Sequence, residues 1–137
     1  MRPVLASLLI LAAACGSSDV TGPSRRVALG QSFELRVGEA AMVADELLVI
    51  GFTGVTSDSR CPIDVVCVWA GDATLRLTLR RLPNAAEVVE VKTPGTPEAS
   101  YRGYTIEVPM LLPAPRAAAP TDTGAYVATL IVRRAAP

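Results

Sequence analysis

The sequence predicts an all-β protein, a small antiparallel β-sandwich that contains one internal disulfide. Three observations support this fold class. Apolar and polar residues alternate with a period of two in several segments, clusters of Pro, Gly and Asn separate these segments, and no segment repeats apolar residues at helical spacing. Six to eight short strands with such spacing are typical of a sandwich, and an immunoglobulin-like arrangement is one form of it.

The clearest alternation lies in the middle of the chain. The segment Leu47–Phe52 is apolar on both faces, which is typical of a central strand. The next strand is expected from Trp69 to Leu79, with an apolar face formed by Trp69, Gly71, Ala73, Leu75, Leu77 and Leu79. This register places Trp69, the only tryptophan of the chain, in the core.

Other strands are expected on both sides of this region. Phe33, Leu35 and Val37 alternate with polar residues, which predicts a half-buried strand. Further strands are expected at Val88–Val91, Tyr104–Leu112 and Tyr126–Val132. Pro109 falls inside one of them, and because proline has no amide hydrogen, that strand should lie at a sheet edge or be bulged there.

The N-terminus has the pattern of an exported, lipid-anchored protein. Arg2 precedes an apolar run from Val4 to Ala14, which is about half the length that a helix needs to cross a bilayer. The segment Leu11-Ala12-Ala13-Ala14-Cys15 resembles the lipobox of bacterial lipoproteins, whose cysteine receives a lipid before the signal peptide is cleaved. An ordinary secretory signal peptide followed by a chance cysteine is the alternative.

We therefore expect three parts in the chain. Residues 1–14 are the signal peptide, residues 15–26 are the lipidated Cys15 and a flexible tether, and residues 27–137 are the β-sandwich domain. The lipid would hold the mature protein at the cell membrane or the outer membrane, facing the periplasm or the exterior.

Cys61 and Cys67 are the two cysteines that remain when Cys15 carries the lipid. A pair of cysteines in an exported chain is most simply a disulfide. By closing this short loop, the disulfide should stabilise the folded state by roughly 2–2.5 kcal/mol, because it lowers the entropy of the unfolded chain. Two cysteines without a histidine are too few for a zinc site, and the spacing is not the Cys-x-x-Cys of redox proteins.

The segment around this pair resembles a known signature. Asp58-Ser59-Arg60-Cys61-Pro62 and then Cys67-Val68-Trp69-Ala70-Gly71 are similar to a motif of small uncharacterised bacterial lipoproteins. In those proteins the motif precedes a long alternating strand and, near the end, a Gly-x-Tyr strand. The resemblance extends from about Leu29 to Arg134 and implies a lipoprotein with a disulfide-bearing β domain. It implies no activity.

The cysteine loop has a structural and a functional interpretation. In the structural one, which we favour, the motif serves to fold the domain and Trp69 is a core residue. In the functional one, the loop is a recognition surface, because Trp and Arg are enriched at binding hot spots. The candidate recognition residues are Asp58, Arg60, Pro62, Asp64 and Trp69. A protease inhibitor that presents Arg60 from the tied loop is the alternative function.

Asp122-Thr123-Gly124-Ala125-Tyr126 matches the Asp-x-Gly-x-Tyr pattern that opens one strand of immunoglobulin-type domains. There the tyrosine hydroxyl bonds back to the backbone as a tyrosine corner. Ala128 stands where those domains have a cysteine. A glycine turn that leads into a terminal strand explains the segment equally well.

Composition argues against several classes of function. The 13 basic and 13 acidic residues balance, whereas nucleic-acid binding needs an excess of positive charge, so we expect no nucleic-acid partner. The chain has no histidine and no nucleophile, phosphate-binding or dinucleotide motif. Acidic residues could still act as an acid–base pair or hold calcium, although most of them are expected on solvent faces. They are Asp45, Glu46, Asp58, Asp64, Asp72, Glu87 and Glu90.

We therefore expect no catalytic residues, metal or cofactor. The function that the sequence favours is a membrane-anchored lipoprotein of the cell envelope with a non-catalytic binding or structural β domain. Its partners would be the membrane, through the N-terminal lipid, and an envelope protein.

Overall fold

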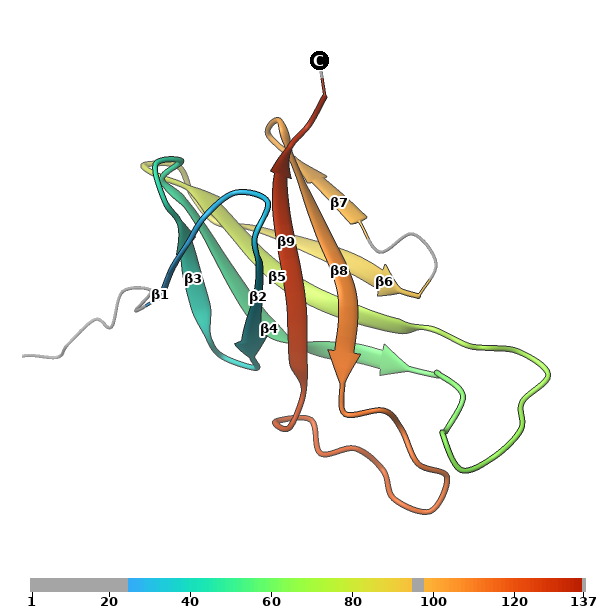
Figure 1. Ribbon diagram of the computed structural model, residues 1–137. Helices are drawn as coiled ribbons and strands as arrows, with labels where there is room; N and C mark the ends of the chain where they lie inside the picture. Colours follow the sequence, from blue (N-terminus) through green and yellow to red (C-terminus); the bar gives the residue numbers. More distant parts are fainter. Residues whose placement is uncertain (1–24, 95–97, 137) are drawn as a thin grey trace, which may run out of the picture.

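The computed structural model describes residues 25–94 and 98–136 (Figure 1). The expected signal peptide, Cys15 and the expected tether as far as Ser24 lie outside these residues. The described residues form strands and loops without a helix. The strands are β1 (Arg25–Val27), β2 (Ser32–Arg36), β3 (Ala40–Val43), β4 (Leu48–Asp58), β5 (Ala73–Arg81), β6 (Glu87–Thr93), β7 (Glu98–Tyr101), β8 (Tyr104–Leu112) and β9 (Val127–Arg134).

These strands make two sheets that pack face to face. The first sheet has the order β1-β3-β4-β5-β6 and the second the order β2-β9-β8-β7. The expected all-β sandwich is therefore confirmed. One detail differs, because β1 pairs with β3 in parallel and the first sheet is not wholly antiparallel.

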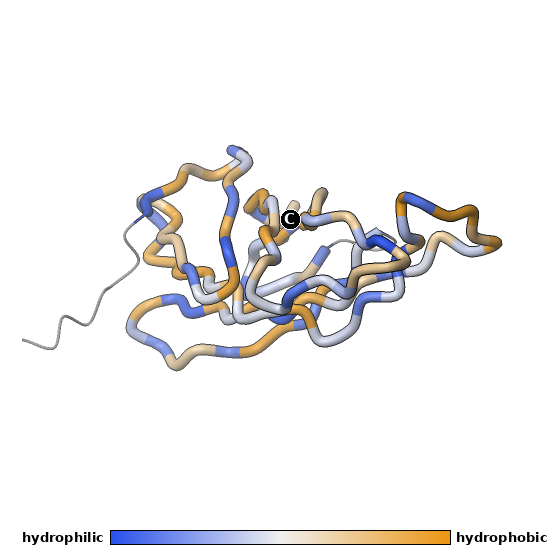
Figure 2. Tube along the Cα trace, turned by 90° about the horizontal axis from the view of Figure 1, so that it is seen from below, coloured by the Kyte–Doolittle hydropathy of each residue, from blue (hydrophilic) through white to orange (hydrophobic). Residues whose placement is uncertain are grey.

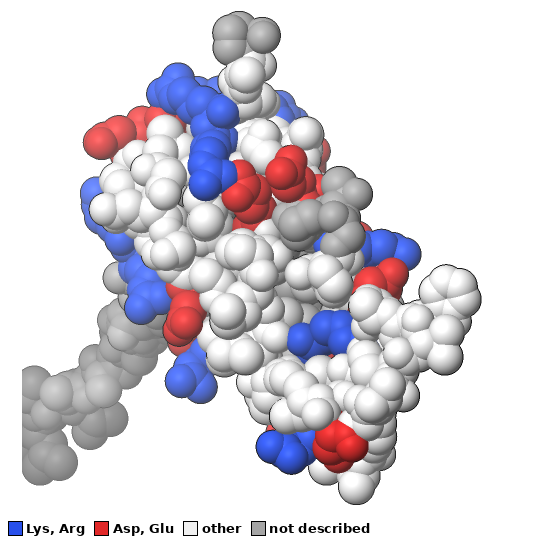
Figure 3. All heavy atoms as spheres, turned by 45° about the vertical axis from the view of Figure 1, so that its right-hand side comes forward, with Lys and Arg blue, Asp and Glu red and all other residues white. Residues whose placement is uncertain are grey.

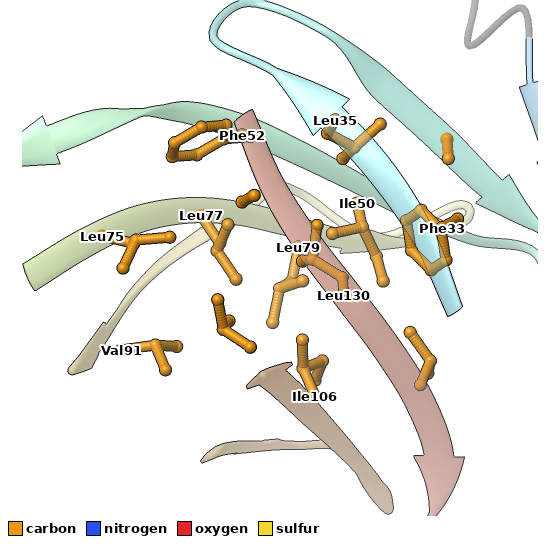
Figure 4. Close-up of a cluster of buried hydrophobic side chains, with 14 of the residues drawn as sticks. Phe33, Leu35, Ile50, Phe52, Leu75, Leu77, Leu79, Val91, Ile106 and Leu130 are labelled. Atoms are coloured by element: carbon orange, nitrogen blue, oxygen red, sulfur yellow. The ribbon is translucent and has the colours of Figure 1, made fainter. Parts of the chain in front are cut away.

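The apolar rows of both sheets meet in one core (Figure 4). Ala73, Leu75, Leu77 and Leu79 on β5 are all fully buried, as the alternation predicts from Ala73 onward. They face side chains of the second sheet that include Ile106 and Leu130. Burial of these rows supplies the main favourable free energy of folding.

Pro109 lies where the sequence analysis places it, at an irregular sheet edge. The pairing of β8 with β9 shifts register between Glu107 and Met110. On its other side β8 pairs with β7 only as far as Glu107, so the backbone at Pro109 has no neighbour strand there. A residue without an amide hydrogen therefore leaves no ladder bond unmade.

Arg25 and Arg26 correct the expected boundary of the domain. The sequence analysis places them in the tether, but they form β1 together with Val27, which packs against the core. A three-residue strand with a single apolar residue gives no alternation that a sequence pattern can register. The folded domain begins no later than Arg25.

The hairpin formed by β4 and β5 determines the shape of one end of the molecule. β4 and β5 pair from Leu48 and Arg81 to Asp58 and Ala73. The loop between them, from Ser59 to Asp72, contains the cysteine motif and projects beyond the sheets (Figure 1). The loop between β8 and β9 lies at the same end, because Ile63 N donates to Pro115 O at 3.0 Å.

The register of β5 can be tested with one core and one surface substitution. We expect Leu77→Ala to lower the free energy of unfolding by about 2–5 kcal/mol, because it leaves a cavity between the sheets. Val88→Ala on β6 should cost about 0.5 kcal/mol or less, because Val88 is exposed. Urea denaturation measures both, and equal losses would contradict the register.

Candidate functional site

The candidate site is the loop from Ser59 to Asp72. Five large apolar side chains lie exposed on it; we call them the apolar tip, and they are Ile63, Val65, Val66, Val68 and Trp69. Val66 is fully exposed, Val68 is 92% exposed and Trp69 is 83% exposed. At its right-hand end Figure 2 shows this loop as a mostly hydrophobic protrusion. Contiguous exposed apolar residues of this size mark interaction surfaces in soluble domains.

The expectation that Trp69 is a core residue is wrong. The alternation is correct from Ala73 to Leu79, but β5 begins only at Ala73. Gly71 has a φ of 65°, which is outside the extended region and breaks the alternation between Trp69 and Ala73. Trp69 therefore points to solvent, as the functional interpretation of the loop requires.

Gly71 also closes the base of the loop. Ser59 N donates to Asp72 O at 2.7 Å and Cys61 N donates to Ala70 O at 2.8 Å, so the two arms of the loop stay paired beyond the strands. A Cβ atom on Gly71 would lie 1.8 Å from the Ser59 carbonyl oxygen. The backbone at Gly71 is therefore packed too closely to admit a side chain.

Asp58 and Arg60 form a nearly buried ion pair beneath the loop. Arg60 Nε donates to Asp58 Oδ1 at 2.9 Å, and Nη2 donates to Oδ2 at 2.7 Å. The two side chains are only 11% and 13% exposed, respectively. The backbone N of Arg60 also donates to Asp58 Oδ1 at 3.2 Å, so the carboxylate fixes the turn at the start of the loop.

The same ion pair connects the loop to the second sheet. Tyr126, immediately before β9, donates a hydrogen bond from its hydroxyl to Asp58 Oδ2 at 3.0 Å. Arg60 donates to the carbonyls of Leu111 at 2.7 Å and Pro113 at 2.9 Å, at the end of β8. We call Asp58, Arg60 and Tyr126 the Asp58 cluster. It joins β4 of the first sheet to β8 and β9 of the second.

Two expectations are corrected by this cluster. The Tyr126 hydroxyl binds the Asp58 carboxylate and not an upstream backbone group, so the structure does not reproduce the immunoglobulin tyrosine corner in that respect. The guanidinium of Arg60 is turned inward against carbonyls and a carboxylate. Arg60 is therefore not presented to a protease from the tied loop, and the premise of the inhibitor alternative is wrong.

Burial and hydrogen bonding act in opposite directions on Asp58. Burial raises the pKa of its carboxyl, but the hydrogen bonds from Arg60 and Tyr126 lower it by more in total, and the pKa lies below its ordinary value of 3.8. Burial, together with the hydrogen bond donated to Asp58, raises the pKa of the Tyr126 hydroxyl above 10.0. Asp58 is therefore ionised and Tyr126 neutral at neutral pH.

A disulfide and a second loop hold the outer half of the projection. Cys61 and Cys67 form the expected disulfide, with their Cα atoms 5.9 Å apart. Asp64 Oδ1 accepts a hydrogen bond from Ala117 N at 2.9 Å, in the loop that follows β8. Pro62, in the segment that the disulfide closes, is half-buried. Of the candidate recognition residues, Asp58, Arg60 and Asp64 thus make hydrogen bonds that hold the loop. Trp69 is the one whose large side chain is mostly exposed to a partner.

Sequence reasoning did not single out four residues of the apolar tip, namely Ile63, Val65, Val66 and Val68. The first three lie between the two cysteines and Val68 follows the second, in a segment without alternation and with Asp64 as its only charge. An apolar run that belongs to no strand is the signal that could have identified them.

A second buried carboxylate lies at the other end of β4, where the sequence analysis expects a solvent-facing one. Glu46 is 7% exposed, accepts a hydrogen bond from the Tyr104 hydroxyl, and accepts one from Arg134 Nη2 at 2.6 Å. These two hydrogen bonds hold the pKa of Glu46 below its ordinary value, and the bond from Tyr104 has the larger effect. Because Glu46 and Asp58 stand at opposite ends of an eleven-residue strand, they do not form an acid–base pair.

Fold and site together define a small disulfide-stabilised β-sandwich with a projecting apolar loop. No protein-family model matches the chain, and neither a curated protein nor a solved structure shows significant similarity to it. Within residues 25–94 and 98–136 no group of three or more Cys, Asp or Glu side chains is arranged to hold a metal ion. The same residues include no helix that is long and apolar enough to cross a membrane.

The Asp58 cluster predicts a pH-dependent stability. We expect Asp58→Asn to lower the free energy of unfolding by about 3 kcal/mol at pH 7, because it leaves the Arg60 charge nearly buried without its partner. Because the folded pKa of Asp58 lies below the unfolded one, its stabilisation is present above the unfolded pKa and is lost as pH falls through the folded pKa.

Urea denaturation of the wild type and of Asp58→Asn, at pH 7 and at pH 3, measures this dependence. The difference between the two proteins should be smaller at pH 3. Tyr126→Phe removes a single hydrogen bond to the same carboxylate and is the milder comparison. It should lower the free energy of unfolding by about 1.5 kcal/mol. A difference for Asp58→Asn that does not change with pH would contradict the role of the charge.

Gly71 allows a separate test of the loop base, with a matched control in Gly103. Both have positive φ, at 65° and 83°, but no atom lies within 4 Å of a Cβ placed on Gly103. Gly103→Ala should cost only the backbone strain, about 1–2 kcal/mol. Gly71→Ala adds the clash with Ser59 and should cost clearly more by thermal denaturation. A smaller loss at Gly71 would contradict this account of the loop base.

Proposed function

We propose that the chain is a lipid-anchored protein of the bacterial cell envelope whose β-sandwich acts by binding and not by catalysis. Its N-terminal lipid, on Cys15, places it at a membrane surface, and the apolar tip is its contact surface. The lipobox-like segment before Cys15 supports the anchor. The single observation that supports the binding role is the exposure of five large apolar side chains on one tied loop.

The position of these side chains argues that they do not serve folding. A residue that stabilises a fold buries apolar area, and Val66, Val68 and Trp69 bury very little. Their exposure also carries a risk of aggregation, which a contact partner would offset. The disulfide, the paired loop base and the Asp58 cluster stiffen the loop, so binding through it would cost little conformational entropy.

The lipid anchor is tested by metabolic labelling with a clickable fatty acid. We expect the wild-type chain to take up the label and to fractionate with membranes, and Cys15→Ser to lose both properties. Uptake of label by the Cys15→Ser protein would sink the assignment of the lipid to this residue.

The contact surface is tested by photocrosslinking in intact cells. A photoreactive residue at position 66, on the apolar tip, should form adducts, whereas one at position 88, an exposed valine of β6, should not. Trp69→Ala should reduce the adducts at position 66 while changing the free energy of unfolding by about 0.5 kcal/mol or less. Equal adduct yields at the two positions would argue against the tip as the contact surface, and a large loss of stability in Trp69→Ala would return Trp69 to the core.

A further inference from the structure

The projecting end of the molecule is nearly free of charge. In the segment from Cys61 to Gly71 the only charged residue is Asp64, whose carboxylate accepts a hydrogen bond from Ala117 N. The neighbouring segment from Pro113 to Pro120 consists of proline and alanine apart from Arg116. Figure 3 shows an uncharged protrusion on the right of the molecule. A charge-poor convex surface that carries one tryptophan has the composition of a membrane-interface anchor.

The direction of β1 turns its first residue, Arg25, toward the end that carries the projecting loop. β1 runs parallel to β3 and β3 antiparallel to β4, so β1 runs away from the end at which β4 reaches Asp58. Arg25 is therefore the end of β1 nearest the loop. Through β3, Arg25 lies level with Ile50 of β4, and the eight residues from Ile50 to Asp58 span about 26 Å.

The length of the segment before Arg25 matches this span. The ten steps of chain from Cys15 to Arg25 can reach at most about 33–36 Å. This reach covers the distance from Arg25 to the base of the projecting loop. Because the apolar tip projects beyond that base, a lipid on Cys15 and the tip can meet one membrane plane when β4 is inclined to the membrane.

The backbone of the loop limits the depth of such a contact. Cys61, Ile63 and Val65 donate their amide hydrogens within the protein, but Val66 to Trp69 form no strand ladder. Irregular backbone is costly in the hydrocarbon layer, where no water satisfies it. The headgroup region supplies water and ester oxygens, and tryptophan is enriched there.

We propose that the apolar tip inserts into the interfacial layer of the same bilayer that holds the lipid on Cys15, and so fixes the orientation of the sandwich on that membrane. This inference rests on the proposed function and names the partner of its contact surface as a lipid surface. A protein groove would also accept a convex apolar loop, but the reach of the segment before Arg25 and the scarcity of charge around the tip favour the bilayer.

The test uses Trp69, the only tryptophan, as its own probe. The lipidated mature chain is reconstituted into vesicles of phosphatidylethanolamine and phosphatidylglycerol. We expect Trp69 emission to shift to the blue relative to the unlipidated Cys15→Ser mature chain in buffer, and to be quenched by lipids brominated near the headgroup end of their acyl chains.

Two matched variants make the test specific. Val66→Asp, still lipidated, should return Trp69 emission to its value in buffer, because a carboxylate on the tip disfavours insertion by about tenfold or more. Val88→Asp, at an exposed valine away from the tip, should leave emission and quenching unchanged. Both positions are exposed, so neither substitution disturbs the core.

Two outcomes would overturn the inference. If Trp69 stays red-shifted and is not quenched by brominated lipid in the vesicles, the tip does not enter the bilayer. If its emission is blue-shifted without that quenching, the tip is buried against another copy of the chain. In either case, protein adducts from position 66 in cells would leave the proposed function standing, and their absence would remove it as well.

Discussion

The contact on which the rest of the loop end depends is the ion pair between Asp58 and Arg60. Both side chains are nearly buried. Each guanidinium nitrogen of Arg60 donates a hydrogen bond to an oxygen of Asp58, Leu111 or Pro113. Tyr126 adds a hydrogen bond to the same carboxylate from the second sheet. Without this pair, the loop between β4 and β5 would be tied to the second sheet only by single bonds at its outer half. The apolar tip is therefore held in place by polar contacts beneath it.

A similar arrangement closes the opposite end of the sandwich. Glu46 accepts hydrogen bonds from Tyr104 and Arg134, which both belong to the second sheet. Asp58 likewise accepts a hydrogen bond from a tyrosine, Tyr126, and one from an arginine, Arg60. Each cluster joins the two sheets at one end of β4, and the apolar core fills the space between them. A buried charge that keeps a partner is tolerated, whereas one that loses its partner is strongly destabilising. The clusters therefore fix the relative position of the sheets more than they add to overall stability.

Sequence reasoning found the features that depend on local pattern. The alternation of Leu75, Leu77 and Leu79, the bulge at Pro109 and the disulfide each have a local signal, and the structure has all three. It missed β3, whose two alanines carry weak strand preference, and β7, a short edge strand that ends in the two-residue turn at Arg102 and Gly103. Trp69 was misplaced because one left-handed residue, Gly71, interrupts the period of two. In the Asp58 cluster, Asp58 and Arg60 are two residues apart, but the hydrogen bond from Tyr126 could not be predicted, because Tyr126 lies 68 residues from Asp58 in the sequence.

The most direct test of this account is the environment of Trp69 in the folded, unlipidated mature chain in buffer. Steady-state emission and iodide quenching report on this residue alone, because the chain has no other tryptophan. Because Trp69 is exposed, we expect a red-shifted emission and strong quenching by iodide under conditions in which the core remains folded. A blue-shifted emission that iodide barely quenches would show that Trp69 belongs to the core, and would contradict the projecting apolar loop on which the proposed function rests.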